Sequence, residues 1–475
     1  MSDDQELTGK RVTVMGLGRF GGGLGVTRWL CRQGARVTVT DQADADALAD
    51  SIRRLHGFDV EYQLGGHDPA LLDRTDLLVV NPAVDKNKSE FFARAASQGV
   101  PWTTEMNLFF PRCRGRIIGV TGSVGKSTTT AMIGDVLRCA VEYLPSPPPR
   151  IWIGGNIGRS LLEELPDIRP GDFVVLELSS FQLEDLARLR CSPSVAVLTS
   201  LRPNHLDRHG TFERYAQAKC GIFKHQDRAT DHAVVCGEEE VALENAAKAR
   251  GGLEGIWSYA LDDALQPVVY RHDARTDHAG KTCLARWENL SLRLPGRHNR
   301  LNAAAAFAVG QALVLPARTW RRALRDFEGL PHRLQHVADL DGVSYYNDSK
   351  GTTPEAAITA LTAFDRPAVI LLGGYDKKVD FDALAKCVVR RCRAAICYGA
   401  TGGKIHAAID AESKGEHRCT VLDAEDFQRA VQLARQAAQP GDVVLLSPAC
   451  ASWDLFTNYE ERGDAFCRII RQWSS

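Results

Sequence analysis

A glycine-rich turn that ends in a lysine and a serine carries the clearest chemical signal in this sequence. The turn, Gly-Ser-Val-Gly-Lys-Ser over residues 122–127, follows an apolar segment at 116–119 and precedes a helical pattern at 128–137. Glycines let backbone N–H groups turn inward around an anion, and the positive end of the helix dipole adds to the attraction. Lys126 would bring a positive charge to the phosphates, and the hydroxyl of Ser127 would bind Mg²⁺. The pattern predicts a site for ATP or a related nucleotide.

A second glycine pattern, G-x-G-x-x-G at residues 16–21, lies near the start of the chain. It follows a β-rich segment at 11–15, and a later strand at 36–40 leads to Asp41, an acid 20 residues after the last glycine. This arrangement is typical of dinucleotide binding, although by itself it leaves NAD, a simpler nucleotide and no ligand open. Two nucleotide-type patterns favour a ligase with a nucleotide-linked substrate over a dehydrogenase, which has no use for the second.

Three ionisable side chains follow predicted strands in the middle of the chain. Glu177 ends the apolar strand at 173–176, where P-loop proteins keep their second contact to Mg²⁺. His205 follows a strand at 194–199, and Lys219 lies on the next predicted helix. Taken alone, a loop histidine and a solvated helix lysine are the commoner explanations for these last two residues.

The last third of the chain alternates strands with helices. Strands are predicted at 343–347, 368–372, 394–398, 420–422 and 443–446. They indicate a parallel sheet with helices on both faces. Polar groups follow three of these strands, at 348–353, 373–377 and 447–452, and the carboxyl ends of strands are where open α/β sheets bind ligands. The segment 234–294 is less regular, and no chemistry is assigned to it.

The predicted fold class is therefore α/β with three domains. We expect an N-terminal Rossmann-like domain over 1–112, a central P-loop ATPase-like domain over 113–328 and a C-terminal Rossmann-like parallel sheet over 329–475. The chain has 475 residues, of which 44% are hydrophobic. That length and composition are enough for several domains with cores of their own.

Composition narrows the classes of function. A net charge of −1 argues against a polyanionic partner such as nucleic acid. The 13 cysteines form no C-x-x-C pair, which favours reduced thiols in a cytosol over a disulfide framework or a zinc site. No apolar run approaches 18 residues, and the first residues are acidic and polar rather than a signal peptide. We expect a soluble cytoplasmic protein that does not engage a membrane.

Eight motifs along nearly the whole chain carry a resemblance to a known family. They are TGSVGKS, GGNIG, LELSSFQLE, PNHLDRHGTFERYAQAK, GRHNRLNAAAA, GLPHR, NDSKGTT and SPACASWDLFTNYEERGDAF. Together they resemble the Mur ligase family. The last motif is the most specific, because other Mur ligases and folylpolyglutamate synthetase share the loop but not that run. Val124 stands where the family usually has Asn, but the backbone cradle does not depend on that side chain.

The resemblance implies an activity. It implies an ATP-dependent ligase that adds D-glutamate to UDP-N-acetylmuramoyl-L-alanine in peptidoglycan precursor synthesis. The γ-phosphoryl group of ATP would activate the alanine carboxylate as an acyl phosphate, which the amine of glutamate then attacks. The sequence leaves the chirality of the glutamate open, and also whether His205 takes the proton of the amine.

Site residues follow from the same resemblance. The ATP-binding residues would be Gly122, Ser123, Val124, Gly125, Lys126, Ser127, Thr128, Asn302, Arg333 and Asp348. The metal ligands would be Ser127, Glu177, His205 and Lys219, which hold two Mg²⁺ ions, with Lys219 as a carbamate. The catalytic residues would be Lys126, Glu177, His205 and Lys219. The substrate-binding residues would be Leu17, Gly18, Asp41, Gln42, Asn156, Lys350, Thr352, Lys377, Ser452, Trp453 and Tyr459.

Within the substrate set, two positions depart from the family pattern. The family commonly has smaller or other apolar side chains at the Trp453 position and Phe at the Tyr459 position, so the glutamate pocket is expected to differ in shape. Three rival functions remain: another ligase of this superfamily, a non-catalytic nucleotide-binding regulator, and a nicotinamide dehydrogenase. The SPACAS run argues against another ligase of the superfamily. A regulator would have lost its metal ligands, but Glu177, His205 and Lys219 are all present. The second phosphate loop argues against a dehydrogenase. We expect a monomer.

Overall fold

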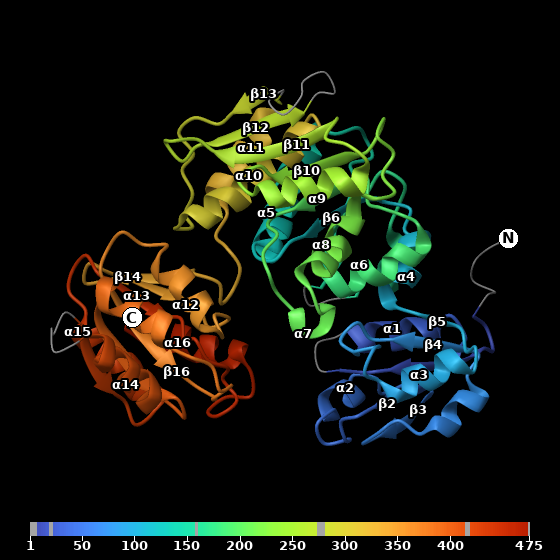
Figure 1. Ribbon diagram of the computed structural model, residues 1–475, viewed down its shortest axis with the longest axis horizontal. Coiled ribbons are helices and arrows are strands. Elements are labelled where there is room, and N and C mark those ends of the chain that lie inside the picture. The colour runs from blue at the N-terminus through green and yellow to red at the C-terminus, as the bar shows by residue number, and fades with distance from the viewer. Residues whose placement is uncertain (1–6, 19–21, 157–159, 273–280, 414–418, 474–475) are drawn as a thin grey trace. The chain divides into compact units, whose positions relative to one another are not determined.

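The computed structural model describes residues 7–18, 22–156, 160–272, 281–413 and 419–473 (Figure 1). The chain forms two compact units. The first unit holds residues 1–290 and 301–324, and the second holds 291–300 and 325–475. No helix among the described residues is long and apolar enough to cross a membrane.

The first unit begins with a parallel sheet of five strands in the order β3-β2-β1-β4-β5. Its strands are β1 (Arg11–Met15), β2 (Arg36–Asp41), β3 (Val60–Leu64), β4 (Leu77–Val80) and β5 (Trp102–Thr103). Its helices are α1 (Gly22–Arg32), α2 (Ala49–Arg53), α3 (Glu90–Ser97) and α4 (Glu105–Phe109). The central strand β1 pairs Val12 with Val37 on one side and with Leu77 on the other, and these apolar residues account for its buried position.

A second sheet of eight strands, in the order β13-β12-β11-β10-β9-β6-β8-β7, completes the first unit. Its strands are β6 (Arg116–Thr121), β7 (Ile151–Gly155), β8 (Phe173–Glu177), β9 (Val195–Leu198), β10 (His232–Cys236), β11 (Ile256–Leu261), β12 (Pro267–His272) and β13 (Lys281–Arg286). Its helices are α5 (Lys126–Ala140), α6 (Ser180–Leu186), α7 (Leu206–His209), α8 (Phe212–Cys220) and α9 (Glu240–Arg250), followed by α10 (Arg297–Ala312) and α11 (Ala317–Asp326).

The strands β6 and β8 position the phosphate loop. All five residues of β8 are buried, and β8 pairs in parallel with β6 and β7, so the sheet is covered on both faces here. The irregular segment 234–294 contributes strands to the far edge of the same sheet. There β12 and β13 run antiparallel to their neighbours, which makes the sheet mixed.

The second unit holds a sheet of six strands in the order β14-β15-β19-β16-β17-β18. Its strands are β14 (Gln335–Leu340), β15 (Val343–Asn347), β16 (Ala368–Gly373), β17 (Cys392–Tyr398), β18 (Thr420–Asp423) and β19 (Val443–Leu446). Its helices are α12 (Pro354–Leu361), α13 (Asp382–Arg391), α14 (Gly402–Ser413), α15 (Phe427–Ala437) and α16 (Tyr459–Gln472). The strands pair in parallel except for β14, which forms an antiparallel hairpin with β15.

The predicted fold class, α/β with parallel-dominated sheets in three domains, is confirmed. Three sheets correspond to the three expected domains, and the first two of these sheets lie within one compact unit. The boundaries at 112 and 328 stay a prediction. The helix expected at 128–137 is longer, because α5 already begins at Lys126 and extends to Ala140.

Candidate active site

The phosphate loop joins β6 to α5 through two glycines with positive φ. Gly125 has φ of 86° and precedes the first residue of α5, a conformation that favours glycine. A Cβ at Gly125 would lie 2.5 Å from Oδ1 of Asn302, so the loop backbone approaches α10 closely. A Cβ at Gly122 would lie 2.0 Å from Oγ1 of Thr199, which follows β9. The glycines therefore allow a close approach of backbone to side chains as well as the turn itself.

Lys126 lies over its own loop. Its Nζ donates to the carbonyl oxygens of Gly122 and Ser123 at 2.8 and 3.3 Å. The backbone N–H of Val124 donates to Oγ of Ser200 at 2.9 Å, and the hydroxyls of Ser123 and Tyr215 lie 2.9 Å apart. These contacts hold the loop in a turned conformation with the lysine charge at its centre.

Glu177 ends β8 close to this loop and has one oxygen available. Nδ2 of Asn156 donates to Oε1 of Glu177 at 2.8 Å, which brings together two residues that the resemblance placed in the site. Oε2 of Glu177 is buried and has no hydrogen-bond partner among the residues that the structure describes. A Cβ at Gly155 would lie 2.2 Å from the carbonyl oxygen of Glu177, so only glycine fits beside it. A buried, unpartnered carboxylate oxygen is a suitable ligand for a hard cation such as Mg²⁺.

Lys219 is a buried lysine rather than the solvated one that its helix position alone favours. Its residue is 2% exposed, and its Nζ donates to Oγ1 of Thr121 at 3.4 Å. Burial, and then the charge of Lys126, lower the pKa of Lys219 to about 7, while Cys220 and Glu177 oppose the shift. A substantial share of the side chain is therefore a neutral amine at physiological pH.

His205 lies at the start of α7 with a positive φ of 52°. Its ring meets the ring of Phe181 edge-on, with centroids 5.2 Å apart. Burial and then the charge of Lys219 lower the pKa of His205, while Asp207 opposes the shift, so the ring is neutral over a wider pH range. A neutral imidazole is the form that binds a metal or accepts a proton.

The described residues contain no group of three or more His, Cys, Asp or Glu side chains that could share a metal ion. In the predicted ligand set only Glu177 and His205 are of those types. Ser127 and Lys219 supply a hydroxyl and an amine.

A cavity of about 670 Å³ lies beside the first glycine pattern. Leu17, Gly18, Asp41 and Gln42 line it, as does Asn156 from the second sheet, so it brings together the five residues expected around the nucleotide-linked substrate. Oδ2 of Asp41 accepts hydrogen bonds from the backbone N–H groups of Leu17 and Gly18, at 2.8 and 3.2 Å. The acid therefore holds the glycine turn, besides lining the cavity.

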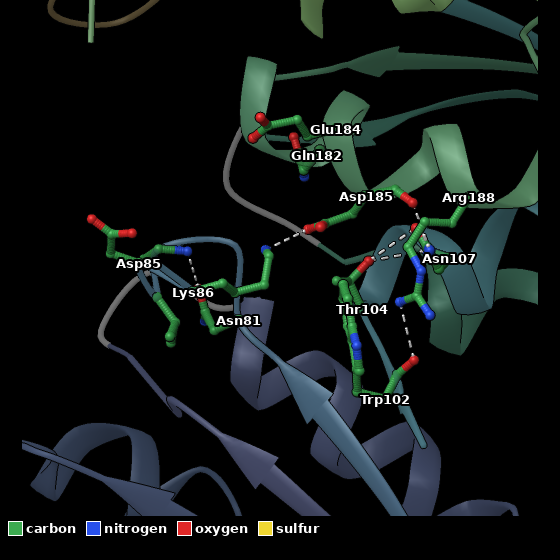
Figure 2. A network of polar contacts seen from close by, with 12 residues as sticks. Asn81, Asp85, Lys86, Trp102, Thr104, Asn107, Gln182, Glu184, Asp185 and Arg188 are labelled. Atoms are coloured by element: carbon green, nitrogen blue, oxygen red, sulfur yellow. Dashed lines mark hydrogen bonds and ion pairs between the residues drawn. The ribbon is translucent and has the colours of Figure 1, made fainter. Parts of the chain in front are cut away.

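Helix α6 joins the first sheet to the second (Figure 2). Nζ of Lys86 lies 3.0 Å from Oδ2 of Asp185, and the carboxylate is almost wholly buried. Nδ2 of Asn107 donates to the Asp185 carbonyl at 3.0 Å, and the guanidinium of Arg188 lies 3.7 Å from the centroid of the Trp102 ring. These contacts fix the wall of the cavity that α6 supplies.

Arg208 makes a similar link from α7. It donates to the carbonyl oxygens of Ala83 and Val84 at 3.3 and 2.6 Å, and its guanidinium lies 3.8 Å from the centroid of the Phe181 ring. Both carbonyls belong to residues that line the cavity. The segment that carries His205 is thus tied to the wall of the cavity.

In the second unit, Asp348 follows β15 and is buried. The Asp348 carboxylate accepts a hydrogen bond from the hydroxyl of Ser447 at 2.7 Å and another from the N–H of Leu334 at 3.2 Å. Burial raises the pKa of Asp348 to about 6, although those two hydrogen bonds and the charge of Arg333 oppose the rise. That Arg333 and Asp348 bind the nucleotide together stays a prediction.

The predicted glutamate-binding residues form two pairings in the second unit. Nζ of Lys350 lies 5.1 Å from the centroid of the Tyr459 ring. Nζ of Lys377 donates to the carbonyl of Thr352 at 3.4 Å and lies 5.8 Å from the centroid of the Trp453 ring. Trp453 is exposed. Two cations beside aromatic faces give this part of the unit a positive, partly apolar surface. Ser452 is buried next to Trp453 in the chain.

Sequence reasoning missed several residues of the cavity wall. Asn81, Glu105, Ser179, Phe181 and Gln182 all line it. Asn81 and Ser179 follow the strands β4 and β8, and that position was a usable signal. No sequence motif marked Glu105 or Phe181 as a cavity residue. Glu105 begins α4 and Phe181 lies within α6, and only the tertiary fold determines where these short helices point.

Family models match most of the chain. The Mur ligase middle domain matches residues 120–310, the Mur ligase glutamate ligase domain matches 332–450, and the MurD-like N-terminal domain of Mur ligases matches 10–103.

Full-length relatives carry one name. The UDP-N-acetylmuramoylalanine–D-glutamate ligase of Roseiflexus sp. (strain RS-1) is 40% identical to this chain, over 99% of this chain and 100% of that protein. The protein of the same name from Pelotomaculum thermopropionicum is 37% identical, over 98% of each chain.

Solved structures agree in fold. The UDP-N-acetylmuramate-alanine ligase MurC of Thermotoga maritima has a TM-score of 0.57 and 19% identity, over 98% of this chain and 100% of that one. The MurF ligase of the same organism, in complex with ADP, has a TM-score of 0.51 and 17% identity, over 99% and 97%.

Proposed function

This chain belongs to the Mur ligase family, and from that membership we propose that it is an ATP-dependent ligase that joins D-glutamate to UDP-N-acetylmuramoyl-L-alanine, releasing ADP and phosphate. The reaction forms a peptide bond in a peptidoglycan precursor. The structural observation that carries the proposal is the convergence of the Lys126 loop, the free oxygen of Glu177 and the buried Lys219 in one unit.

A carboxylate is a poor electrophile, because its charge repels an amine and oxide is a poor leaving group. Transfer of the γ-phosphoryl group of ATP to the alanine carboxylate gives an acyl phosphate, from which phosphate departs as the amine attacks. Lys126 offsets the charge of the two anions that must meet, and the phosphate loop orients the nucleotide by its backbone N–H groups. ATP is therefore assigned to residues 122–128 with Asn302, whose side chain lies against Gly125 and Thr129.

Glu177, Ser127 and His205 are the residues of this chain that would hold Mg²⁺. The unpartnered Oε2 of Glu177 and the neutral ring of His205 fit such a role. When bound, two Mg²⁺ ions would neutralise charge on the phosphates and on the reacting carboxylate. Asn156 fixes the Glu177 carboxylate by its hydrogen bond and so sets the direction of the free oxygen.

We assign Lys219 as a carbamate. Its lowered pKa leaves an amine that can react with CO₂, with loss of a proton, to give an anionic oxygen ligand. The modification replaces a cation beside the metal ligands with an anion, which relieves the repulsion between Lys219 and Lys126. It also supplies the third strong ligand that the set otherwise lacks.

The cavity of the first unit is assigned to the UDP-linked substrate. Leu17 and Gly18 would lie near the diphosphate, Asp41 and Gln42 near the uracil, and Asn156 near the reacting end. The second unit would contribute the remaining residues. Arg333 and Asp348 are assigned to the adenosine and γ-phosphate. The residues assigned to glutamate are Lys350, Thr352, Lys377, Ser452, Trp453 and Tyr459.

A phosphate-release assay tests the function. ATP, UDP-N-acetylmuramoyl-L-alanine and a panel of D- and L-amino acids would be supplied together and with each component omitted. We expect release that needs all three components and is fastest with D-glutamate. Faster release with another amino acid would favour the rival ligases, and no release with any combination would favour the non-catalytic regulator.

We also propose that the enzyme acts as a monomer in the cytoplasm, on small molecules rather than on nucleic acid or a membrane. The net charge of −1 supports the absence of a polyanionic partner. Light scattering on the purified protein measures its mass in solution directly, and a mass near twice 52.1 kDa would overturn the monomer.

A further inference from the structure

Glu105, the first residue of α4, has an unusual environment for a carboxyl group. It is 9% exposed, and its Oε1 is buried without a hydrogen-bond partner in the described part of the chain. Its Oε2 would lie 3.3 Å from a Cβ at Gly22, so the carboxyl group reaches the first residue of α1. Glu105 also lines the cavity beside the glycine turn. A buried, unsatisfied acid thus faces the place where an anionic ligand is expected.

The N-terminus of α1 is the anion-binding end of this sheet. A helix start leaves N–H groups without partners inside the helix, and its dipole attracts negative charge. The N–H groups of Leu17 and Gly18, earlier in the turn, already donate to Asp41. A diphosphate in this cavity would therefore meet α1 at Gly22, which is also where Glu105 lies.

An ionised Glu105 would repel a diphosphate, whereas a neutral one would bind it. A protonated carboxyl has an O–H to donate, and the unpartnered oxygen shows that no protein group now uses that position. Burial raises the pKa of Glu105 to about 7, and a hydrogen bond with Ser160 opposes the rise. The arrival of two further negative charges raises that pKa again.

Several charged groups on the elements packed against α4 have ion-pair partners of their own. Arg28 and Arg32 of α1 lie against Glu163, which belongs to the short helix at 162–167. On α6, Asp185 lies against Lys86, and the exposed Glu184 is 3.8 Å from His209.

The cavity wall adds its own titratable groups. Asp41, His67, Asp85 and Lys88 line the cavity with Glu105. Asp41 accepts the turn N–H groups, and Nδ1 of His67 lies 2.9 Å from the hydroxyl of Thr40. Lys88 lies 3.7 Å from Asp85. Among the described carboxyl groups of this wall, Glu105 has a buried oxygen with no hydrogen-bond partner.

We propose that Glu105 binds the diphosphate of the nucleotide-linked substrate as a neutral acid, donating its O–H to a phosphate oxygen, so that substrate binding takes up a proton. The proposal rests on the proposed function, which assigns the UDP-linked substrate to this cavity. It adds a residue that selects the substrate by its diphosphate and makes its affinity depend on pH.

Calorimetry of substrate binding to the whole protein measures the proton directly. UDP-N-acetylmuramoyl-L-alanine is titrated at pH 7.5 in two buffers with different heats of ionisation, and the difference in heat gives the protons taken up. The diphosphate diester and the alanine carboxylate of this probe do not titrate between pH 6 and 9. With a pKa of about 7 in the free protein, we expect uptake of roughly three-quarters of a proton.

Variants separate Glu105 from other sources of protons. If only the neutral acid binds, wild-type affinity should fall about 50-fold between pH 7 and pH 9. Glu105→Gln keeps the shape and an N–H donor, so it should bind with little pH dependence and without proton uptake. Glu105→Ala should lack uptake and bind more weakly at pH 7. Glu184→Gln is the control: it makes the same substitution at an exposed carboxyl on α6 that does not line the cavity, and it should retain the uptake.

Three outcomes would overturn the proposal. The first is that the wild type takes up no proton when it binds the substrate. The second is that proton uptake persists in Glu105→Gln. The third is that the affinity of the wild type and that of Glu105→Gln fall equally as the pH rises. Melting temperature and ATP affinity, measured on each variant, show whether the fold and the second sheet are intact. Because the assay needs binding alone, it distinguishes failure of this proposal from failure of the ligase activity, which phosphate release reports. A wild type that does not bind the probe at all would overturn both.

Discussion

Replacing Lys219 tests the most specific chemical step proposed for this site. In water a lysine has a pKa near 10.5, so roughly one molecule in a thousand is neutral at pH 7.5. With the pKa lowered to about 7, about three-quarters of the Lys219 side chains are neutral at that pH. The fold therefore raises the concentration of reactive amine by a factor of several hundred, which is what carbamate formation needs.

The sign of the pH dependence follows from the same shift. Protonation of Lys219 removes the amine that reacts with CO₂, so activity should fall as the pH drops below about 7. Enzyme kept free of CO₂ at pH 6 should be nearly inactive and should recover when bicarbonate is added at pH 7.5. A ¹³C-bicarbonate label should give a carbamate signal in the wild type that Lys219→Ala lacks.

The alanine variant supplies the decisive comparison. Lys219→Ala should lose nearly all turnover, with partial recovery when a short carboxylic acid fills the vacant ligand position. Lys224→Ala, which changes a lysine exposed shortly after α8, is the matched control and should retain both activity and the labelled signal. Full activity of Lys219→Ala would refute the reasoning. Full activity in a wild type that shows no labelled carbamate would refute the modification.

Three further changes have expected outcomes. Lys126→Ala should lower turnover by about 10²–10³-fold with an unchanged melting temperature, because its charge acts on phosphates and its contacts are to its own loop; half-normal phosphate release would contradict the ATP site. Lys86→Met leaves the buried Asp185 carboxylate without its ion-pair partner and should cost about 3–5 kcal/mol in urea unfolding, most of which adding Asp185→Leu should restore; an unchanged midpoint would contradict the burial argument. Gly155→Ala should impair turnover more than nucleotide affinity, because its Cβ would displace the backbone of Glu177, and normal kinetics would exclude that close contact.

The fold could be predicted where strands are apolar on both faces. β1, β15 and β19 begin and end at the expected residues, because nearly all of their residues are buried, Val, Leu or Tyr are common among them, and the next residue in each case is a glycine or polar. The hairpin of β14 and the strands β11 to β13 were not predicted. Edge strands face solvent on one side, and alternating polar residues there resemble a loop.

The site was predictable to the extent that its chemistry is local. The glycine-lysine turn is a continuous motif, and its geometry follows from the sequence. The burial of Lys219 and the ionic contact between Lys86 and Asp185 depend on segments far apart in the chain, so residue type alone favoured solvent exposure for Lys219. Glu105 shows the same limit, since its missing partner is a property of the packed cavity wall.

The path of the chain between the two units has a practical consequence for exchanging domains among relatives. The polypeptide enters the second unit at residue 291, returns to the first at 301, and enters the second again at 325. Helix α10 spans the second of these crossings. A chimera built with one junction at 325 would take the large segment of the second unit from one parent and its ten residues at 291–300 from the other. Swapping that unit intact requires two fragments and three junctions, two of which lie within helices, one in α10 and one in α11.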